Sequence, residues 1–500
     1  RPDMKISRTQ VSPSASFPRL RSLVLGVVLT GGASSCQPEQ EAGALAEESG
    51  TQRKSLRVAN SLTTQALVFN AITTNPLASS QLISGGLQSL FAPLSGNAYL
   101  QRQLLDPDAQ QVMSYLVSCA LGPSSQIQWE DPSSPGTLRT WEGQLGLCPD
   151  WKHAAPSAQC KNRVSACLLA RNNALGRRVE LSLRGEDAMR PALFSMDVVT
   201  PPVESDPITD APVASFAACT APSSAPTRDC GWTGEGIGRC VPGQPVRLGA
   251  GARAPDQCTT GGVLGAASGA PMMLRVCADL AGCDHASARW LDQGQDACGT
   301  TQPSVTFTCP ASGVFNVSSQ AQNSALAGTV FLQVETGTPA TTSYPLSEAD
   351  VFSVREGAYY GNIFDPNSIG ANVYVDKEGK IHGKQERIQG SVYRKMYSCQ
   401  AAGWANTAAY AAHRICALPS SGSNCAAIHT GTCVDPAIPS YPTSRCALSD
   451  GPLVPGDMDF EKCRDTTGVA WNEPITVFLH DPCDLSGENQ VTCKRNDRRK

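Results

Sequence analysis

The sequence predicts a β-rich α+β fold: a mixed α/β, disulfide-rich host domain with an antiparallel β-sandwich module inserted into it. Two observations favour this. The chain of 500 residues has 44 glycines and 36 prolines but only 17% charged residues, a composition suited to short strands and turns. Helical and strand-like patterns also alternate along the chain, and a proline-containing seam flanks each end of a strand-rich central region.

Residues 1–35 have the order of a signal peptide, with five basic residues and one acid around a short apolar run, Leu23–Thr30. That run is far shorter than the roughly 20 residues of a membrane-spanning helix. Small residues then lead to Cys36. This order resembles a bacterial lipobox, which implies that Cys36 is lipidated. Ala33 stands where the lipobox prefers Leu, so ordinary cleavage into a secreted product is the alternative.

The expected location is the cell envelope, as an outer membrane lipoprotein, because Gln37 follows the cysteine where sorting to the inner membrane favours Asp. Residues 36–57 are polar and without periodicity, which predicts a flexible tether. Removing residues 1–35 takes five basic residues and one acid from a chain of net charge −4 and leaves about −8, which disfavours nucleic acid as a partner. The expected partners are the membrane, through the lipid anchor, and an extracellular polysaccharide or protein.

The chain has 21 cysteines, and an even number is left once Cys36 is set aside, as a disulfide framework requires. No CxxC or CxxCH occurs, so zinc sites, thioredoxin-like chemistry and covalent haem are disfavoured, and neither a metal nor a cofactor is expected. Connectivity cannot be deduced from spacing. The disulfide candidates are Cys119, Cys148, Cys160, Cys167, Cys219, Cys230, Cys240, Cys258, Cys277, Cys283, Cys298, Cys309, Cys399, Cys416, Cys425, Cys433, Cys446, Cys463, Cys483 and Cys493.

Residues 58–200 are predicted to form the first part of the mixed α+β host domain. An amphipathic helix follows Asp106 or Asp108 as its N-cap, with Gly122 as its stop. "SQIQWE" and "TLRTWEGQLG" flank "DPSSPG", which predicts a β-hairpin. A second helix is expected in "AQCKNRVSACLLARNNALG", and "RRVELSLRG" alternates like a strand.

Repeated prolines in residues 201–218 predict a linker, and residues 219–345 are predicted to form the β-sandwich module, because strand-length runs alternate there with turn signals. The order "LRVC…GC…DQGQDACG…PSVTFTCPASGVFNV" resembles the pre-peptidase C-terminal type of β-sandwich, found beside secreted bacterial peptidases. That resemblance covers about 60 residues and implies an accessory or binding module.

Residues 346–495 are predicted to be the Cys-rich second part of the host domain, with a hairpin turning at Lys377–Gly379, and residues 496–500 a basic tail. The pieces "YLVSCAL", "WEGQLGL", "VELSLRG" and "EGAYYGNIF" resemble uncharacterised surface lipoproteins that predatory soil bacteria encode in many copies. In that pattern "LSLRG" closely precedes "EGAYYGNIF", which implies that the sandwich is an insertion. No activity is attached to this resemblance.

Signatures of catalysis are weak. The sequence has no GxSxG and no HExxH, and the histidines are scattered at positions 153, 285, 382, 413, 429 and 480. Paired carboxylates of a glycoside hydrolase could come from Glu356 with Asp365, or from Asp457, Asp459 and Glu461. Asp292 and Asp296 could bind calcium, although an acidic surface turn is the preferred interpretation.

The sequence thus predicts a secreted, lipid-anchored, disulfide-stabilised cell-envelope protein with a non-catalytic binding or scaffolding role and with no catalytic residue assigned. The alternative is a secreted hydrolase of polysaccharide or protein, with the β-sandwich as its accessory binding module. A Ser/His/Asp site assembled from distant residues would follow no sequence order.

Overall fold

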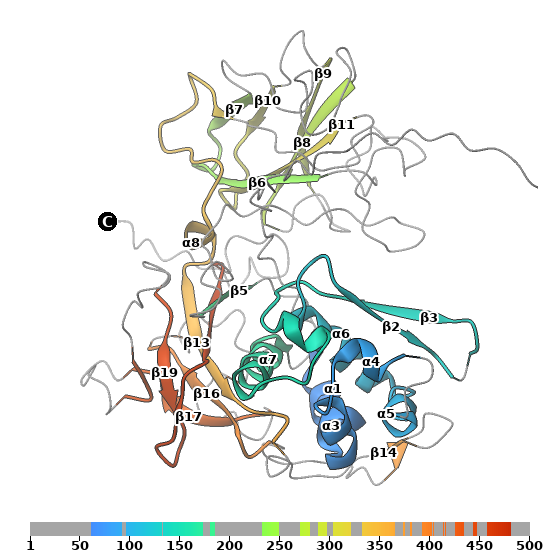
Figure 1. The fold of residues 1–500 in the computed structure, drawn as a ribbon. Coiled ribbons are helices and arrows are strands. Elements are labelled where there is room, and N and C mark those ends of the chain that lie inside the picture. Colours follow the sequence, from blue (N-terminus) through green and yellow to red (C-terminus); the bar gives the residue numbers. More distant parts are fainter. Residues whose placement is uncertain are drawn as a thin grey trace, which may run out of the picture. The chain divides into compact units, whose positions relative to one another are not determined.

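Figure 1 shows the fold in a computed structural model. The structure describes residues 62–92, 97–132, 134–173, 181–185, 233–249, 271–280, 289–297, 304–321, 333–365, 374–375, 381–382, 393–402, 404, 414, 416, 426–434, 444–447 and 458–481. They all belong to one unit of the chain, residues 53–500. The predicted signal peptide, Cys36, the tether, the 201–218 linker and the basic tail lie outside the described residues.

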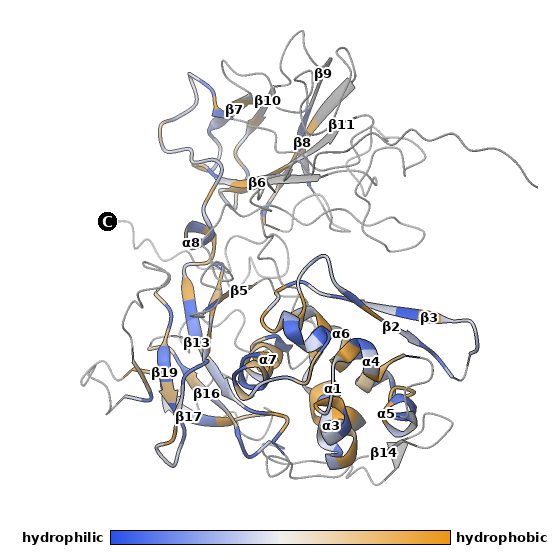
Figure 2. Cartoon of the chain, viewed as in Figure 1, coloured by the Kyte–Doolittle hydropathy of each residue, from blue (hydrophilic) through white to orange (hydrophobic). Residues whose placement is uncertain are grey.

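The described residues up to 173 are mainly helical. Asparagines separate successive short helices: the Asn70 side chain accepts hydrogen bonds from the amides of Ile72 and Thr73, and so starts a new helix where the previous one ends. Figure 2 shows apolar residues along helices α1 and α3. The helices are α1 (Thr64–Phe69), α2 (Ala71–Thr74), α3 (Pro76–Leu82), α4 (Leu87–Leu90), α5 (Ala98–Gln103), α6 (Pro107–Ala120), the one-turn 3-10 helix η1 (Pro149–Lys152) and α7 (Ala158–Ala170).

The two long helices confirm the sequence prediction. Asp106 caps α6 by accepting a hydrogen bond from the amide of Asp108, 3.1 Å away, and Pro107 occupies the first turn. Ser157 caps α7 in the same way through the amide of Cys160. The apolar faces of both helices are buried in one hydrophobic core.

The predicted hairpin is present as β2 (Gln126–Glu130) and β3 (Leu138–Glu142), paired antiparallel. Trp129 and Trp141 face the core and stack with their ring centroids 6.1 Å apart. The hairpin packs beside α4 and α6 (Figure 1). Polar residues are prominent on β3 in Figure 2, and of this strand only Trp141 is buried.

A five-stranded sheet packs against α7 and combines residues from distant parts of the chain. Its strand order is β17-β16-β13-β21-β5, and only the β16–β17 pair is parallel. Because β5 pairs with β21, the segment before residue 185 completes a sheet built from residues after 353. The strands are β5 (Leu181–Arg184), β13 (Val354–Gly361), β16 (Met396–Gln400), β17 (Ile428–Thr432) and β21 (Ile475–Leu479).

Strand β5 is buried on both faces, although its sequence alternates between apolar and polar residues. The Ser182 hydroxyl donates a hydrogen bond to the carboxylate of Glu348. Arg184 lies over the ring of Phe478, with 3.6 Å from its guanidinium carbon to the ring centroid, and donates to the carbonyl of Phe352. The polar residues of this strand therefore bind buried partners instead of water.

Residues 233–334 contribute two further sheets, of order β6-β11-β8-β9 and β10-β7-β12. Strands from both sheets share one hydrophobic core, which includes Val246, Leu274, Phe307 and Phe315. The strands are β6 (Thr233–Arg239), β7 (Pro245–Gly249), β8 (Pro271–Ala278), β9 (Trp290–Ala297), β10 (Val305–Thr308), β11 (Val314–Ala321) and β12 (Gln333–Val334).

The preferred interpretation of Asp292 and Asp296 as an acidic surface turn is wrong. Both belong to strand β9, which pairs with β8, and the Asp292 carboxylate accepts a 2.7 Å hydrogen bond from the amide of Thr306. The sequence misled here because "DQGQD" is rich in turn-forming residues, whereas pairing with β8 holds the segment extended.

Shorter elements complete the described chain. The predicted hairpin around Lys377–Gly379 has paired strands, with its turn outside the described residues. Among the described residues, no helix combines the length and apolar composition needed to span a membrane. The remaining elements are β1 (Leu62–Thr63), β4 (Asn172–Asn173), α8 (Glu348–Val351), β14 (Tyr374–Val375), β15 (Ile381–His382), β18 (Cys446–Ala447), β19 (Glu461–Arg464) and β20 (Ala470–Trp471).

Disulfide bonds join ten of the predicted cysteines, and Cys277 and Cys416 are also disulfide-bonded. The described pairs are Cys119–Cys167, Cys148–Cys160, Cys240–Cys309, Cys399–Cys433 and Cys446–Cys463. Cysteines outside the described residues are Cys219, Cys230, Cys258, Cys283, Cys298, Cys425, Cys483 and Cys493. The structure is thus β-rich, α+β and disulfide-rich.

Candidate functional site

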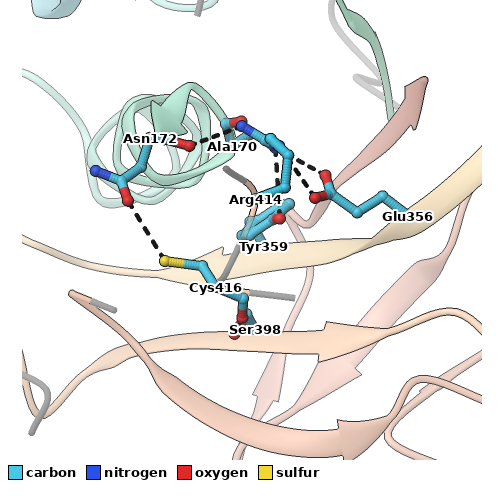
Figure 3. Close-up of polar contacts among 7 residues, drawn as sticks. All are labelled: Ala170, Asn172, Glu356, Tyr359, Ser398, Arg414 and Cys416. Atoms are coloured by element: carbon cyan, nitrogen blue, oxygen red, sulfur yellow. Dashed lines mark hydrogen bonds and ion pairs between the residues drawn. The ribbon is translucent and has the colours of Figure 1, made fainter. Parts of the chain in front are cut away.

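A buried ion pair lies where α7 meets the five-stranded sheet (Figure 3). Glu356, on β13, accepts two hydrogen bonds from Arg414: 3.0 Å from Nε to Oε1 and 2.7 Å from Nη2 to Oε2. Both side chains are fully buried, with at most 1% of either exposed. The paired geometry is the strong, charge-assisted form of the Arg–carboxylate interaction.

Arg414 also binds the end of helix α7. Its Nη2 donates to the carbonyl of Ala170 at 2.6 Å, and its Nη1 donates to the carbonyl of Asn172 at 2.7 Å. A cation is favourable at a helix C-terminus, where carbonyl groups lack intrahelical partners. Arg414 therefore ties the helix to the sheet and satisfies buried carbonyl groups at the same time.

The neighbouring Tyr359 stays neutral. Burial, reinforced by the negative charge of Glu356, holds the pKa of its phenol well above the usual value. Burial alone would lower the pKa of Arg414, but the carboxylate of Glu356 outweighs it, so the pKa of Arg414 lies above its ordinary value. The guanidinium is thus charged, and the phenol is not poised to act as a general base.

Two potential nucleophiles near this pair are also engaged. The Ser398 hydroxyl donates to the backbone carbonyl of Cys416. The Cys416 sulfur lies 3.4 Å from Oδ1 of Asn172, but it is disulfide-bonded and carries no proton. This cluster is consequently a structural junction and not a catalytic centre.

Of the carboxylates considered for glycoside hydrolysis, Glu356 and Asp365 have different partners. Glu356 is bound to Arg414, whereas Asp365 forms a separate ion pair with Lys395. Asp459 is buried and Glu461 lies on β19, while Asp457 lies outside the described residues. None of the four described carboxylates lines either of the cavities described below.

The described histidines are also dispersed. His153 is exposed in the turn after η1, His382 lies on β15, and His480 is buried with Nδ1 3.0 Å from the carbonyl oxygen of Asp481. His429, on β17, is half-buried, and burial lowers its pKa. His285 and His413 lie outside the described residues.

A groove lies between the β2–β3 hairpin and helices α4 and α5. It is a cavity of about 340 Å³, lined by Phe91, Gln101, Gln128, Glu130, Asp131, Pro132, Pro135 and Leu138. Its aromatic support is rigid: Phe91 meets Trp141 edge-on at 5.7 Å, and Trp141 stacks on Trp129.

The polar lining of this groove suits a ligand with hydroxyl groups. Gln128 is exposed on β2, where its backbone pairs with β3, so its side-chain amide offers both donors and an acceptor to a ligand. Glu130 is exposed and accepts a 3.0 Å hydrogen bond from the amide of Gly136. Asp131 lies 3.7 Å from Arg139, which offsets its charge. None of the described lining residues is Lys or Arg, and two of them are acidic, so the groove disfavours an anionic ligand.

A second cavity, of about 310 Å³, lies beside the Cys148–Cys160 disulfide and is lined in part by Asp150, Trp151 and Arg163. The cavity wall consists of the loop before α7 and the first turn of that helix, which the disulfide links. Two cavities thus lie on the helical part of the chain, and none of the described residues that line them is a histidine.

Comparison with models of protein families, with curated proteins and with solved structures found no match.

Sequence reasoning did not identify Arg414 or the groove. The one signal for Arg414 is a lone basic residue among small and apolar neighbours, "AAHRICAL". The groove combines a hairpin with a helix end some 40 residues earlier in the chain, and such an arrangement has no local pattern.

Proposed function

We propose that this chain is a secreted, lipid-anchored, disulfide-stabilised cell-envelope protein that binds an extracellular ligand without transforming it. The groove beside the β2–β3 hairpin carries this proposal, because it joins a rigid aromatic support to exposed hydrogen-bonding groups. Among the described residues that line it there is no histidine, serine, threonine or cysteine. The signal-like residues 1–35 and the lipobox-like order at Cys36 support the location.

The architecture behind the proposal is a β-sandwich module inserted into a discontinuous host domain. Two sheets of residues 233–334 share one core and are linked by the Cys240–Cys309 disulfide, which supports a sandwich. Pairing of β5 with β21 supports a host domain that the module interrupts. By its resemblance to the pre-peptidase C-terminal type, the module would assist binding.

We further propose that the ligand is a segment of an uncharged extracellular polysaccharide. Amide and carboxylate groups, as on Gln128 and Glu130, match the alternating donors and acceptors of sugar hydroxyls. The prolines and Leu138, which is 57% exposed, offer apolar contact for a sugar ring. A hydrolase remains the alternative, because two carboxylates, Glu130 and Asp131, also line the groove, although Arg139 offsets the charge of Asp131.

Ligand binding tests the groove. Titration of the intact protein with a panel of neutral oligosaccharides should give saturable binding, followed by tryptophan fluorescence or calorimetry. The Gln128→Ala and Glu130→Gln variants should weaken binding at least tenfold, and Leu77→Ala, which changes an exposed residue outside the groove lining, should not. Binding of a basic peptide instead would assign a protein ligand, and equal binding by all variants would exclude the groove.

Mass spectrometry of the mature protein under non-reducing conditions tests the location. The expected product begins at an acylated Cys36 and has no free thiol. An unmodified N-terminus downstream of Cys36 would indicate a secreted product without an anchor, and several free thiols would contradict the disulfide framework.

A further inference from the structure

Four buried cysteines of the C-terminal strands lie together. They are Cys399 on β16, Cys433 directly after β17, Cys446 on β18 and Cys463 on β19. Although they form two disulfides, the sulfur atoms of Cys399 and Cys446 are only 3.4 Å apart. Because both sulfurs are disulfide-bonded, this approach is a contact between two disulfides and not a thiol hydrogen bond.

The arrangement of sulfur atoms approaches that of a tetrahedral metal site. The sulfurs of Cys399, Cys446 and Cys463 all lie within 4.8 Å of one another, and Cys433 is bonded to Cys399. Four thiolates around Zn²⁺, at Zn–S distances of about 2.3 Å, are about 3.8 Å apart. Opening the two S–S bonds to that separation is therefore the main movement that metal binding requires.

The backbone holds the four residues in place by contacts other than the disulfides. The amide of Cys433 donates to the carbonyl of Gln400, and the amide of Cys446 donates to the carbonyl of Cys433, both at 2.8 Å. Cys446 and Cys463 are cross-strand partners of β18 and β19. None of these contacts involves a sulfur atom, so reduction of the disulfides removes none of them directly.

Charge in the chain also suits a tetrathiolate site. Bound to Zn²⁺, four thiolates carry a net charge of −2. Three basic residues are direct chain neighbours of Cys446 and Cys463, namely Arg445, Lys462 and Arg464. Nearby cations stabilise thiolates over thiols. The four sulfurs are also shielded from solvent, as in closed, structural zinc sites.

We propose that, when both disulfides are reduced, Cys399, Cys433, Cys446 and Cys463 bind one Zn²⁺. Two equivalents of a dithiol reductant open the two S–S bonds and give four thiols, and the reductant is oxidised to its disulfide. Zn²⁺ then displaces four protons as four Zn–S bonds form. This proposal is independent of the proposed function, since it concerns the reduced chain alone.

Cobalt binding to the full chain tests the proposal. The protein, reduced anaerobically with a dithiol that is then removed, is titrated with Co²⁺. One equivalent should bind with the charge-transfer and visible bands of a tetrahedral tetrathiolate complex, and Zn²⁺ should displace it. The Cys446→Ser/Cys463→Ser variant should lose these bands. The matched control Cys119→Ser/Cys167→Ser lacks a different disulfide and should keep them.

Far-UV circular dichroism of the same samples covers the case in which reduction unfolds the C-terminal strands. Zn²⁺ should then restore the spectrum of the reduced chain, because metal binding and folding are coupled, and should not restore that of Cys446→Ser/Cys463→Ser. The proposal is overturned if reduced protein binds no Co²⁺, or if the band intensities of the Cys446→Ser/Cys463→Ser variant equal those of the unaltered chain.

Discussion

Helix α7 is fixed on two sides by different physical means. Towards α6 it is held by apolar contacts and by the Cys119–Cys167 disulfide, and neither involves a charged group. Towards the five-stranded sheet it is held by the charged Arg414, which bridges its last carbonyl groups to Glu356. The apolar contact with α6 tolerates substitution by residues of similar volume. The contact through Arg414 loses much of its stabilising effect when either charge is removed alone, because the other charge is then buried without a partner.

The largest effect is expected from removing the cation of this junction. Arg414→Met leaves the Glu356 carboxylate buried without its partner and the carbonyl oxygens of Ala170 and Asn172 without their donor. We expect a loss of about 3–5 kcal/mol in the free energy of unfolding, measured by urea denaturation at neutral pH. Arg394→Ala, at an exposed position in the same sheet region, is the control and should change it by less than about 0.5 kcal/mol.

Replacing both charged residues tests how much of the lost stability comes from leaving the Glu356 carboxylate unpaired. Glu356→Leu with Arg414→Met should recover part of the stability lost in the single variant, because the double variant buries no unpaired charge. A double variant no more stable than Arg414→Met would show that the loss arises from the carbonyl groups of Ala170 and Asn172, which lack their donor in both variants.

The apolar side of α7 can be weakened through its disulfide. The Cys119–Cys167 bond closes a span of 48 residues, against 12 for Cys148–Cys160. In the chain-entropy description, removal of the longer link by Cys119→Ala/Cys167→Ala costs about 4 kcal/mol, and removal of the shorter one by Cys148→Ala/Cys160→Ala costs about 3 kcal/mol. Thermal unfolding of both variants gives the order, and a reversed order would argue that cavity formation dominates.

A smaller, pH-dependent effect is expected at Asp465, after β19. Its carboxylate accepts hydrogen bonds from Thr467, Val469 and Trp471. Burial raises its pKa, but these hydrogen bonds together hold the pKa below the ordinary 3.8. Its contribution is therefore fully present above that value and is lost as the pH falls through the lower, folded pKa.

Asp465→Asn should thus lower stability by about 1.5–3 kcal/mol at neutral pH. Its unfolding free energy should also fall less steeply than that of the unaltered chain when the pH is lowered below 3.8. Equilibrium unfolding at pH 7 and at pH 3 measures both effects, and parallel pH profiles of the two proteins would contradict the proposed role of the carboxylate.

The smallest effect on stability is expected at the groove. Leu138→Ser removes a side chain that is 57% exposed, so the free energy of unfolding should change by less than about 0.5 kcal/mol. Oligosaccharide binding should nevertheless weaken, because the substitution removes an apolar contact from the groove. A large loss of stability would place Leu138 in the fold and not in the ligand site.

Local patterns predicted much of the secondary structure. The spacing of apolar residues after Asp106 predicted α6 with its cap, and the turn residues of "DPSSPG" predicted the β2–β3 hairpin. The same reasoning misread β9, because pairing with a distant strand overrides the turn preference of its residues. Hydrophobic patterns of period 2 or 3.6 depend on residues that are close along the chain, whereas β9 is extended because it pairs with β8.

The candidate sites were beyond such patterns. Glu356 was considered as a catalytic acid, but its partner lies 58 residues away and carries no recognisable motif. The four clustered cysteines have no local signal for the same reason, because spacing along the chain does not report distance in space. Their closeness arises from the packing of β16, β18 and β19.

The pairing of β5 with β21 has a consequence for folding. Arg184 and Thr476 are paired residues of β5 and β21, so these two strands can pair only by bringing together segments about 290 residues apart in the chain. Such a contact is costly in loop entropy and slow to form. Until then, β5 and β13, the two strands that β21 joins, each present an unpaired edge to which other copies of the chain can add. Aggregation during refolding should therefore rise steeply with protein concentration, while a chain refolded in dilute solution closes its own sheet.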